Sequence, residues 1–80
     1  MLWGLNYSRE ASNYALDSLP YNEAVLNAIQ GLALMPSPYP PDIIKSDVLG
    51  ILIWRVAEHE VYYQVNEDRL TITILAIHPL

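Results

Sequence analysis

The sequence predicts a small α+β domain in which a helical hairpin packs on a small antiparallel sheet, with the element order β-α-α-β-β-β. Two observations carry this prediction. Apolar residues recur at helical spacing between residues 11 and 32, and apolar and polar residues alternate in strand fashion from residue 59 onward. The chain has 80 residues, which is well below the size at which one hydrophobic core divides, so residues 1–80 are expected to form a single domain.

The N-terminal part is expected to form a short strand and a first helix. Residues 2–7 alternate loosely between apolar and polar side chains, which favours a strand. Ser8 is a good N-cap residue for the helix that follows, and Pro20 ends that helix. A narrow apolar stripe lies at helical spacing between them: Ala11, Tyr14, Ala15 and Leu19.

A second helix gives the clearest periodic signal in the chain. Its apolar residues recur at i, i+3, i+4 and i+7: Val25, Ala28, Ile29 and Leu32. Asn22 is expected to cap its N-terminus, and Pro36 stops it because the residue before a proline is pushed out of the α region. Two consecutive helices with a short connection are expected to run antiparallel and to turn their apolar stripes to a common core.

Residues 36–41 contain four of the six prolines, so this segment is expected to be extended and unable to donate regular sheet hydrogen bonds. We interpret it as a rigid connector. The alternative interpretation is a polyproline segment that docks in an aromatic-lined groove of another protein.

The remaining residues predict strands. Residues 51–56 form a nearly continuous apolar run, which is typical of a strand buried on both faces, and a turn follows near Ala57 and Glu58. The next strand alternates, with one face formed by Val61, Tyr63 and Val65 and the other by Glu60, Tyr62 and Gln64. Residues 66–68 have turn chemistry. In the last strand one face is expected to hold Leu70, Ile72, Ile74 and Ala76.

Composition excludes several classes of function. Nine carboxylates against four lysines and arginines give a net charge of −5, so phosphate backbones would be repelled and nucleic acid is not an expected partner. The absence of cysteine excludes disulfides and thiolate metal sites, and the two histidines lack any standard ligand spacing, so no metal and no cofactor is expected. No signal peptide is expected, because no basic region precedes the first apolar residues. No run approaches the ~20 apolar residues of a membrane span, so we expect a cytoplasmic protein.

The run from Ile53 to Leu70, together with the helix end Leu34-Met35-Pro36-Ser37-Pro38, resembles the RelE/ParE toxins of bacterial type II toxin–antitoxin pairs. In those proteins a helical hairpin is followed by a strand with an Arg-Val dipeptide, a short acidic turn and an apolar strand. The resemblance covers nearly the whole chain. It implies the same fold, an antitoxin-like partner and, in active members, cleavage of mRNA.

The resemblance also indicates candidate catalytic residues, namely Arg55, Glu60 and His78. Arg55 begins the Arg-Val dipeptide, and His78 matches a histidine near the end of the family's last strand. Glu60, however, occupies the place of an arginine, and Ile51 and Ile53 lie where ribosome-dependent members tend to carry lysines. Most of the family's cationic residues are therefore replaced.

Three hypotheses follow. The first is a toxin-like component that acts mainly by binding an antitoxin. Because the chain is acidic, and because 52% of its residues are hydrophobic and only 16% charged, this partner is expected to be neutral or basic and held by apolar contacts. The second is an active translation- or topoisomerase-inhibiting toxin with an atypical site on Arg55, Glu60 and His78. The third is a small homo-oligomeric domain that self-associates through edge strands.

Overall fold

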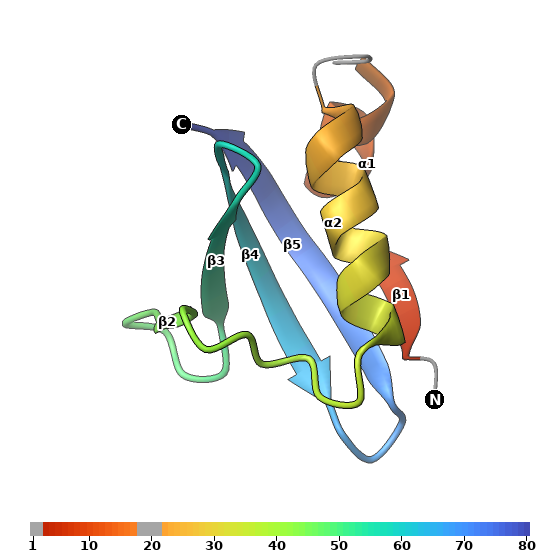
Figure 1. Cartoon of the computed structure of the whole chain (residues 1–80), viewed down its shortest axis with the longest axis vertical. Helices are drawn as coiled ribbons and strands as arrows, with labels where there is room; N and C mark the ends of the chain where they lie inside the picture. The colour runs from red at the N-terminus through yellow and green to blue at the C-terminus, as the bar shows by residue number, and fades with distance from the viewer. Residues whose placement is uncertain (1–2, 18–21) are drawn as a thin grey trace.

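The computed structural model describes residues 3–17 and 22–80, which form two helices and one five-stranded sheet (Figure 1). The elements in chain order are β1 (Gly4–Tyr7), α1 (Arg9–Asp17), α2 (Glu23–Leu34), β2 (Ile44–Lys45), β3 (Leu52–Val56), β4 (His59–Asn66) and β5 (Thr71–Pro79). The predicted α+β class and helical hairpin are confirmed. Leu2, Leu19 and Pro20, which the sequence placed in the first strand and at the end of the first helix, lie outside the described residues. The two-residue strand β2 was not expected.

The sheet is mixed, which corrects the prediction of an antiparallel sheet. Its strand order is β1-β5-β4-β3-β2, and β1 pairs with β5 in parallel while the other neighbours are antiparallel. The helical hairpin returns the chain to the end of the sheet at which β1 begins, where the Trp3 N–H donates to the Ala33 carbonyl at 2.8 Å (Figure 1). The strands β3, β4 and β5 then alternate in direction, and β5 runs parallel to β1. Alternation shows which face a strand buries but not which strand is its neighbour.

Ser8 caps α1, as predicted, and also joins this helix to β5. Its hydroxyl accepts a hydrogen bond from the Ala11 N–H at 3.1 Å and donates one to the Leu75 carbonyl at 2.5 Å. Leu75 is the extra residue of a β-bulge, because Tyr62 pairs with Ala76 and Tyr63 with Ile74. The start of α1 is therefore fixed to an irregularity in the neighbouring strand.

This bulge changes which residues of β5 face the core. Ile72 and Ile74, which lie before it, share one face as predicted and are fully buried, but after it the buried residue is Ile77. The expectation that Ala76 shares the face of Ile72 and Ile74 is therefore wrong. Leu70 also does not share that face, because it lies in the turn before β5 with a φ of 53°.

Asn22 does not cap α2 with its side chain. Instead, its fully buried amide donates to the carbonyls of Tyr14 and Ala15 at 2.9 and 2.8 Å, and so closes the C-terminal end of α1. The last carbonyls of a helix have no partner within the helix, and a donor from the next segment satisfies them. The residue predicted to begin one helix therefore ends the other.

The core lies between α2 and the sheet. The predicted stripe of α2 is confirmed, with Val25, Ile29 and Leu32 at most 1% exposed. The sheet contributes mainly Val61, Tyr63, Ile72, Ile74 and Ile77. In contrast, β3 is only half-buried on both faces, because only the two-residue strand β2 lies beyond it. The expectation of a strand buried on both faces is therefore wrong.

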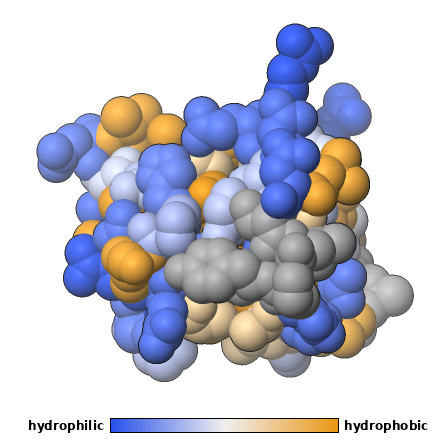
Figure 2. Space-filling view, turned by 90° about the horizontal axis from the view of Figure 1, so that it is seen from above, coloured by the Kyte–Doolittle hydropathy of each residue, from blue (hydrophilic) through white to orange (hydrophobic). Residues whose placement is uncertain are grey.

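Seen from above, the surface is mostly hydrophilic, with apolar residues in separate patches (Figure 2). Within residues 3–17 and 22–80, no helix is long and apolar enough to cross a membrane.

The turn between β3 and β4 is strained. Its two residues, Ala57 and Glu58, have φ values of 53° and 60°, which L-residues with a Cβ atom rarely adopt. We expect Glu58→Gly to raise the free energy of unfolding by about 1 kcal/mol, because glycine adopts this conformation without steric cost. Gln30→Gly, at an exposed position inside α2, is the matched control and should lower it by roughly 0.5–1 kcal/mol. Urea denaturation measures both, and a loss of stability in both variants would contradict the assignment of strain.

Candidate functional site

The three candidate catalytic residues lie in one row across the sheet. Arg55 of β3 is the cross-strand partner of Glu60 in β4, and Glu60 is the partner of His78 in β5. Since neighbouring strands are about 4.8 Å apart, the Cα atoms of Arg55 and His78 are separated by about 10 Å. The row lies on the face of the sheet opposite the core, which we call the outer face. The sheet thus brings together all three residues.

The positive charge of Arg55 is matched by Glu60. The Arg55 Nε donates to a Glu60 carboxylate oxygen at 2.9 Å, and the Tyr62 hydroxyl donates to the other oxygen at 3.0 Å. These two hydrogen bonds, the one from Arg55 foremost, hold the pKa of Glu60 below its usual value. Glu60 in turn raises the pKa of Tyr62. Tyr62, which the sequence placed on the same face as Glu60, therefore supports the row through its hydrogen bond to Glu60.

His78 stands beside this ion pair. Its ring lies 5.2 Å from the ring of Tyr62, measured between centroids, and its Nε2 is 3.4 Å from a carboxylate oxygen of Glu10 in the first turn of α1. The structure shows that α1 reaches the outer face through this residue.

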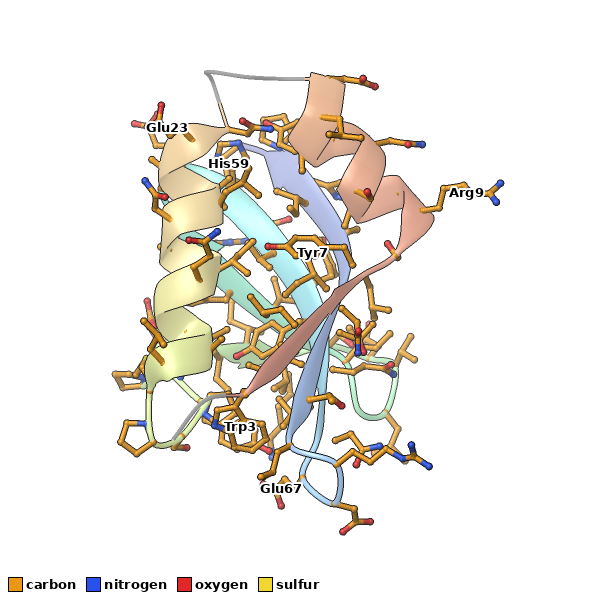
Figure 3. The ribbon with its side chains drawn as sticks, turned by 90° about the vertical axis from the view of Figure 1, so that its right-hand side faces the viewer. Trp3, Tyr7, Arg9, Glu23, His59 and Glu67 are labelled. Carbon is orange, nitrogen blue, oxygen red and sulfur yellow. The ribbon has the colours of Figure 1, made fainter. Side chains whose placement is uncertain are left out.

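His59 lies on the opposite face from Glu60, as expected for adjacent residues of a strand. It is 2% exposed and lies between α2 and the sheet (Figure 3). Its Nδ1 is 2.7 Å from the Ala57 carbonyl and its Nε2 is 2.6 Å from the Tyr14 hydroxyl. The carbonyl only accepts, so Nδ1 donates to it. His59 therefore joins α1 to the strained turn and has no access to the row.

The row has limited means for acid–base catalysis. A general base works best when its pKa lies near the operating pH, and the pKa of Glu60 is shifted away from neutrality. The Arg55 side chain is 61% exposed and its Nε is already engaged, but its other N–H groups can still meet an anion. The geometry suits binding of one anionic or polar group better than proton transfer.

A second feature of the outer face lies at its other end, near the turn between β4 and β5. It is a hollow of about 630 Å³ between this turn, the outer face and the loop before β3, and we call it the polar hollow. Its lining consists of Tyr39, Gly50, Gln64, Val65, Asn66, Glu67, Asp68, Thr71 and Thr73. The Tyr39 hydroxyl donates to Glu67 at 2.8 Å, and Glu67 lies at the end of the molecule away from His59 (Figure 3). Burial, and secondarily Glu67, raises the pKa of Tyr39.

Sequence reasoning missed the polar hollow. The one available signal is that Gln64, Asn66, Thr71 and Thr73 are polar residues at outward positions of two paired strands. No group of three or more metal-ligating side chains exists among the described residues.

The segment formed by β2 and the loop that follows it borders the hollow and exposes large apolar side chains. We call it the apolar loop and define it by Ile44 of β2 and by Val48 and Leu49 of the loop, which are 44, 60 and 97% exposed. Gly50, with a φ of 87°, brings this loop to β4, where a Cβ atom on Gly50 would lie 3.9 Å from the Gln64 amide nitrogen. The apolar loop and the polar hollow therefore form one continuous surface.

Among the comparisons with known proteins, only the one with solved structures gives matches. No protein-family model matches the chain, and no curated protein matches it. Among solved structures, a chain of the archaeal RelE-RelB complex from Pyrococcus horikoshii is 27% identical with a TM-score of 0.74, and the match covers 99% of this chain and 96% of that one. The toxin–antitoxin complex RelBE2 from Mycobacterium tuberculosis matches at 15% identity and a TM-score of 0.69, over 100% of both chains.

A third match is the E. coli toxin RelE, in a mutant form bound to an antitoxin RelB peptide. It has 13% identity and a TM-score of 0.71, over 100% of this chain and 85% of that one. All three likenesses cover 99–100% of this chain, so they include both helices and all five strands. The fold implied by the sequence resemblance is thereby confirmed.

Proposed function

We propose that this chain, which has the RelE-like toxin fold, is the toxin-like component of a type II toxin–antitoxin pair and acts mainly by binding an antitoxin. The observation that supports this most is the likeness over the whole domain to a chain of the Pyrococcus horikoshii RelE-RelB complex. The uncovered outer face, with the polar hollow beside the apolar loop, supplies a surface for such a partner.

The neutralised row supports binding rather than RNA cleavage. Cleavage by a ribose 2′-hydroxyl needs cationic groups to stabilise the charge that develops on the phosphate oxygens. In the row, Arg55 is the only lysine or arginine, and Glu60 already compensates it. The overall charge of −5 further opposes the approach of RNA.

The alternative is an active toxin with an atypical site. It is favoured by one observation, the alignment of Arg55, Glu60 and His78 in one row on an accessible face. In this alternative Arg55 would hold the phosphate and His78 would transfer a proton.

Expression in a bacterial host separates these functions. We expect the chain alone to leave growth unchanged and total mRNA uncleaved, because the row lacks free cationic groups. Co-expression with the product of the neighbouring gene should give a stable complex that elutes as one species in gel filtration. Growth arrest that Arg55→Ala abolishes would instead establish the active toxin, and a homo-oligomer that does not bind the neighbouring product would contradict the proposal.

A further inference from the structure

Within residues 3–17 and 22–80, no helix packs over the outer face of the sheet. The buried side chains of α2 and the strands lie on the other face, and α1 reaches the outer face only at its edge through Glu10. The uncovered face of a sheet normally carries polar residues. The polar hollow follows this rule, whereas the strongly exposed apolar loop beside it does not.

The polar hollow is rich in hydrogen-bond acceptors. Glu67 and Asp68 contribute carboxylates, and the remaining polar side chains contribute amide or hydroxyl oxygens: Tyr39, Gln64, Asn66, Thr71 and Thr73. No lysine or arginine is part of its lining. Arg69 follows in the same turn, where its backbone N–H is bound by Asn66, but it lies outside the lining.

Glu67 keeps capacity for a further contact. The Tyr39 hydroxyl uses one of its oxygens, Oε1, and an ionised carboxylate can accept several hydrogen bonds. A lysine or arginine side chain from another molecule is the group that matches such a lining, because it supplies only donors and one positive charge. A carboxylate or phosphate would meet repulsion instead.

The apolar loop supplies the second requirement for a partner. Leu49 is 97% exposed and Val48 60% exposed. They are the two residues that precede Gly50, which lines the hollow. Burial of such side chains by a partner is favourable because it removes apolar surface from water. Apolar residues next to an acidic hollow match a segment with apolar and basic residues.

From these features we infer that the polar hollow and the apolar loop together dock a basic amphipathic segment of the partner protein. This inference rests on the proposed function, since that partner is the antitoxin. Basic side chains of the segment enter the hollow toward Glu67 and Asp68, and its apolar side chains cover Val48 and Leu49. The basic side chains of the segment complement the two carboxylates of the hollow, and they are also attracted by the net charge of −5 on the chain.

Titration of the ¹⁵N-labelled chain with a synthetic amphipathic peptide of leucine and lysine tests this inference by NMR. Chemical-shift changes should be confined to Tyr39 and to residues 44–52 and 64–73. A matched peptide of leucine and glutamate should cause none. Changes spread over the whole surface, or located on the other face, would overturn the inference. Concentration-dependent shifts of the same residues without peptide would also overturn it, since a second copy of the chain would then be the occupant.

Two charge-reversal variants make the test specific. Glu67→Lys/Asp68→Lys should weaken binding of the leucine–lysine peptide at least about tenfold, because like charges would then meet in the hollow. The control Asp17→Lys/Glu58→Lys changes the net charge equally, from −5 to −1, at exposed residues away from the hollow, and should change the affinity by less than about twofold. Equal weakening in both variants would show that binding follows net charge only, and would overturn the inference.

The same variants separate this inference from the proposed function. If the neighbouring gene product binds the natural chain and Glu67→Lys/Asp68→Lys equally well, the surface is wrong and the proposed function stands. If the peptide binds at the mapped surface but the neighbouring gene product does not bind at all, the surface stands and the proposed function fails.

Discussion

Replacement of Tyr63 by alanine is expected to lower the free energy of unfolding by about 3–5 kcal/mol, which is the usual cost of removing a buried aromatic ring. Tyr63 has no exposed surface and belongs to the core between the sheet and α2. Its hydroxyl also donates to the Pro38 carbonyl at 2.9 Å, so it fixes the proline-rich connector to the sheet. Urea denaturation measures the loss. Tyr62→Ala, on the outer face, is the matched control and should cost about 1 kcal/mol.

Tyr63→Phe separates the ring from the hydroxyl. It should lower the free energy of unfolding by about 1–3 kcal/mol, because the Pro38 carbonyl would lose its donor in a buried place. Equal losses in Tyr63→Phe and Tyr63→Ala would show that the ring contributes nothing, and would contradict the packing described above.

The stability of the natural chain should also fall at alkaline pH because of this residue. Burial raises the pKa of Tyr63 well above its ordinary value, whereas in the unfolded chain it is about 10. A group whose pKa is raised by folding stabilises the fold fully below its unfolded pKa, and this contribution is lost as the pH rises above that value. In Tyr63→Phe the fall above about pH 10 should therefore be smaller.

Asn22→Asp is expected to lower the free energy of unfolding by about 3–5 kcal/mol at neutral pH, since it places an unpaired charge in a buried site. The natural amide donates to the Tyr14 and Ala15 carbonyls, and a carboxylate there would meet two acceptors without a proton to donate. Folding would raise the pKa of the introduced carboxylate, so the variant should regain stability as the pH falls. Denaturation at several pH values measures this.

Asn27→Asp is the control, because Asn27 is exposed on α2 and its substitution should change the stability by less than about 0.5 kcal/mol. Similar losses in the two variants would indicate a general effect of charge. In that case the donation from Asn22 to the end of α1 would not be the cause.

The elements that the sequence predicted well are those with a local cause. The stripe of α2 was predicted because side chains three and four residues apart share a helix face. The burial of Tyr63 followed from the strict alternation of β4 in the same way. Ser8 was predicted as a cap because its partner, the Ala11 N–H, is three residues away.

The errors concern contacts between residues that are distant in the chain. The parallel pairing of β1 with β5, the bulge at Leu75 and the redirection of Asn22 all depend on which elements become neighbours. The row of Arg55, Glu60 and His78 was indicated by the family resemblance, and only the strand register places its members side by side. The polar hollow also needs Tyr39 and Gly50 from distant parts of the chain, so the outward polar residues of β4 and β5 indicate only one of its walls.

The bulge at Leu75 has a consequence for how the gene can change in length. A chain that lost this one codon could keep every cross-strand partner of β4, because Tyr62 and Tyr63 already pair with the residues on either side of Leu75. It would lose the carbonyl that Ser8 binds. A codon lost from β3, which pairs with β4 without a bulge, would instead shift part of that strand by one place, which exchanges inward and outward residues. The strand with the spare residue therefore tolerates shortening better than the strand without one.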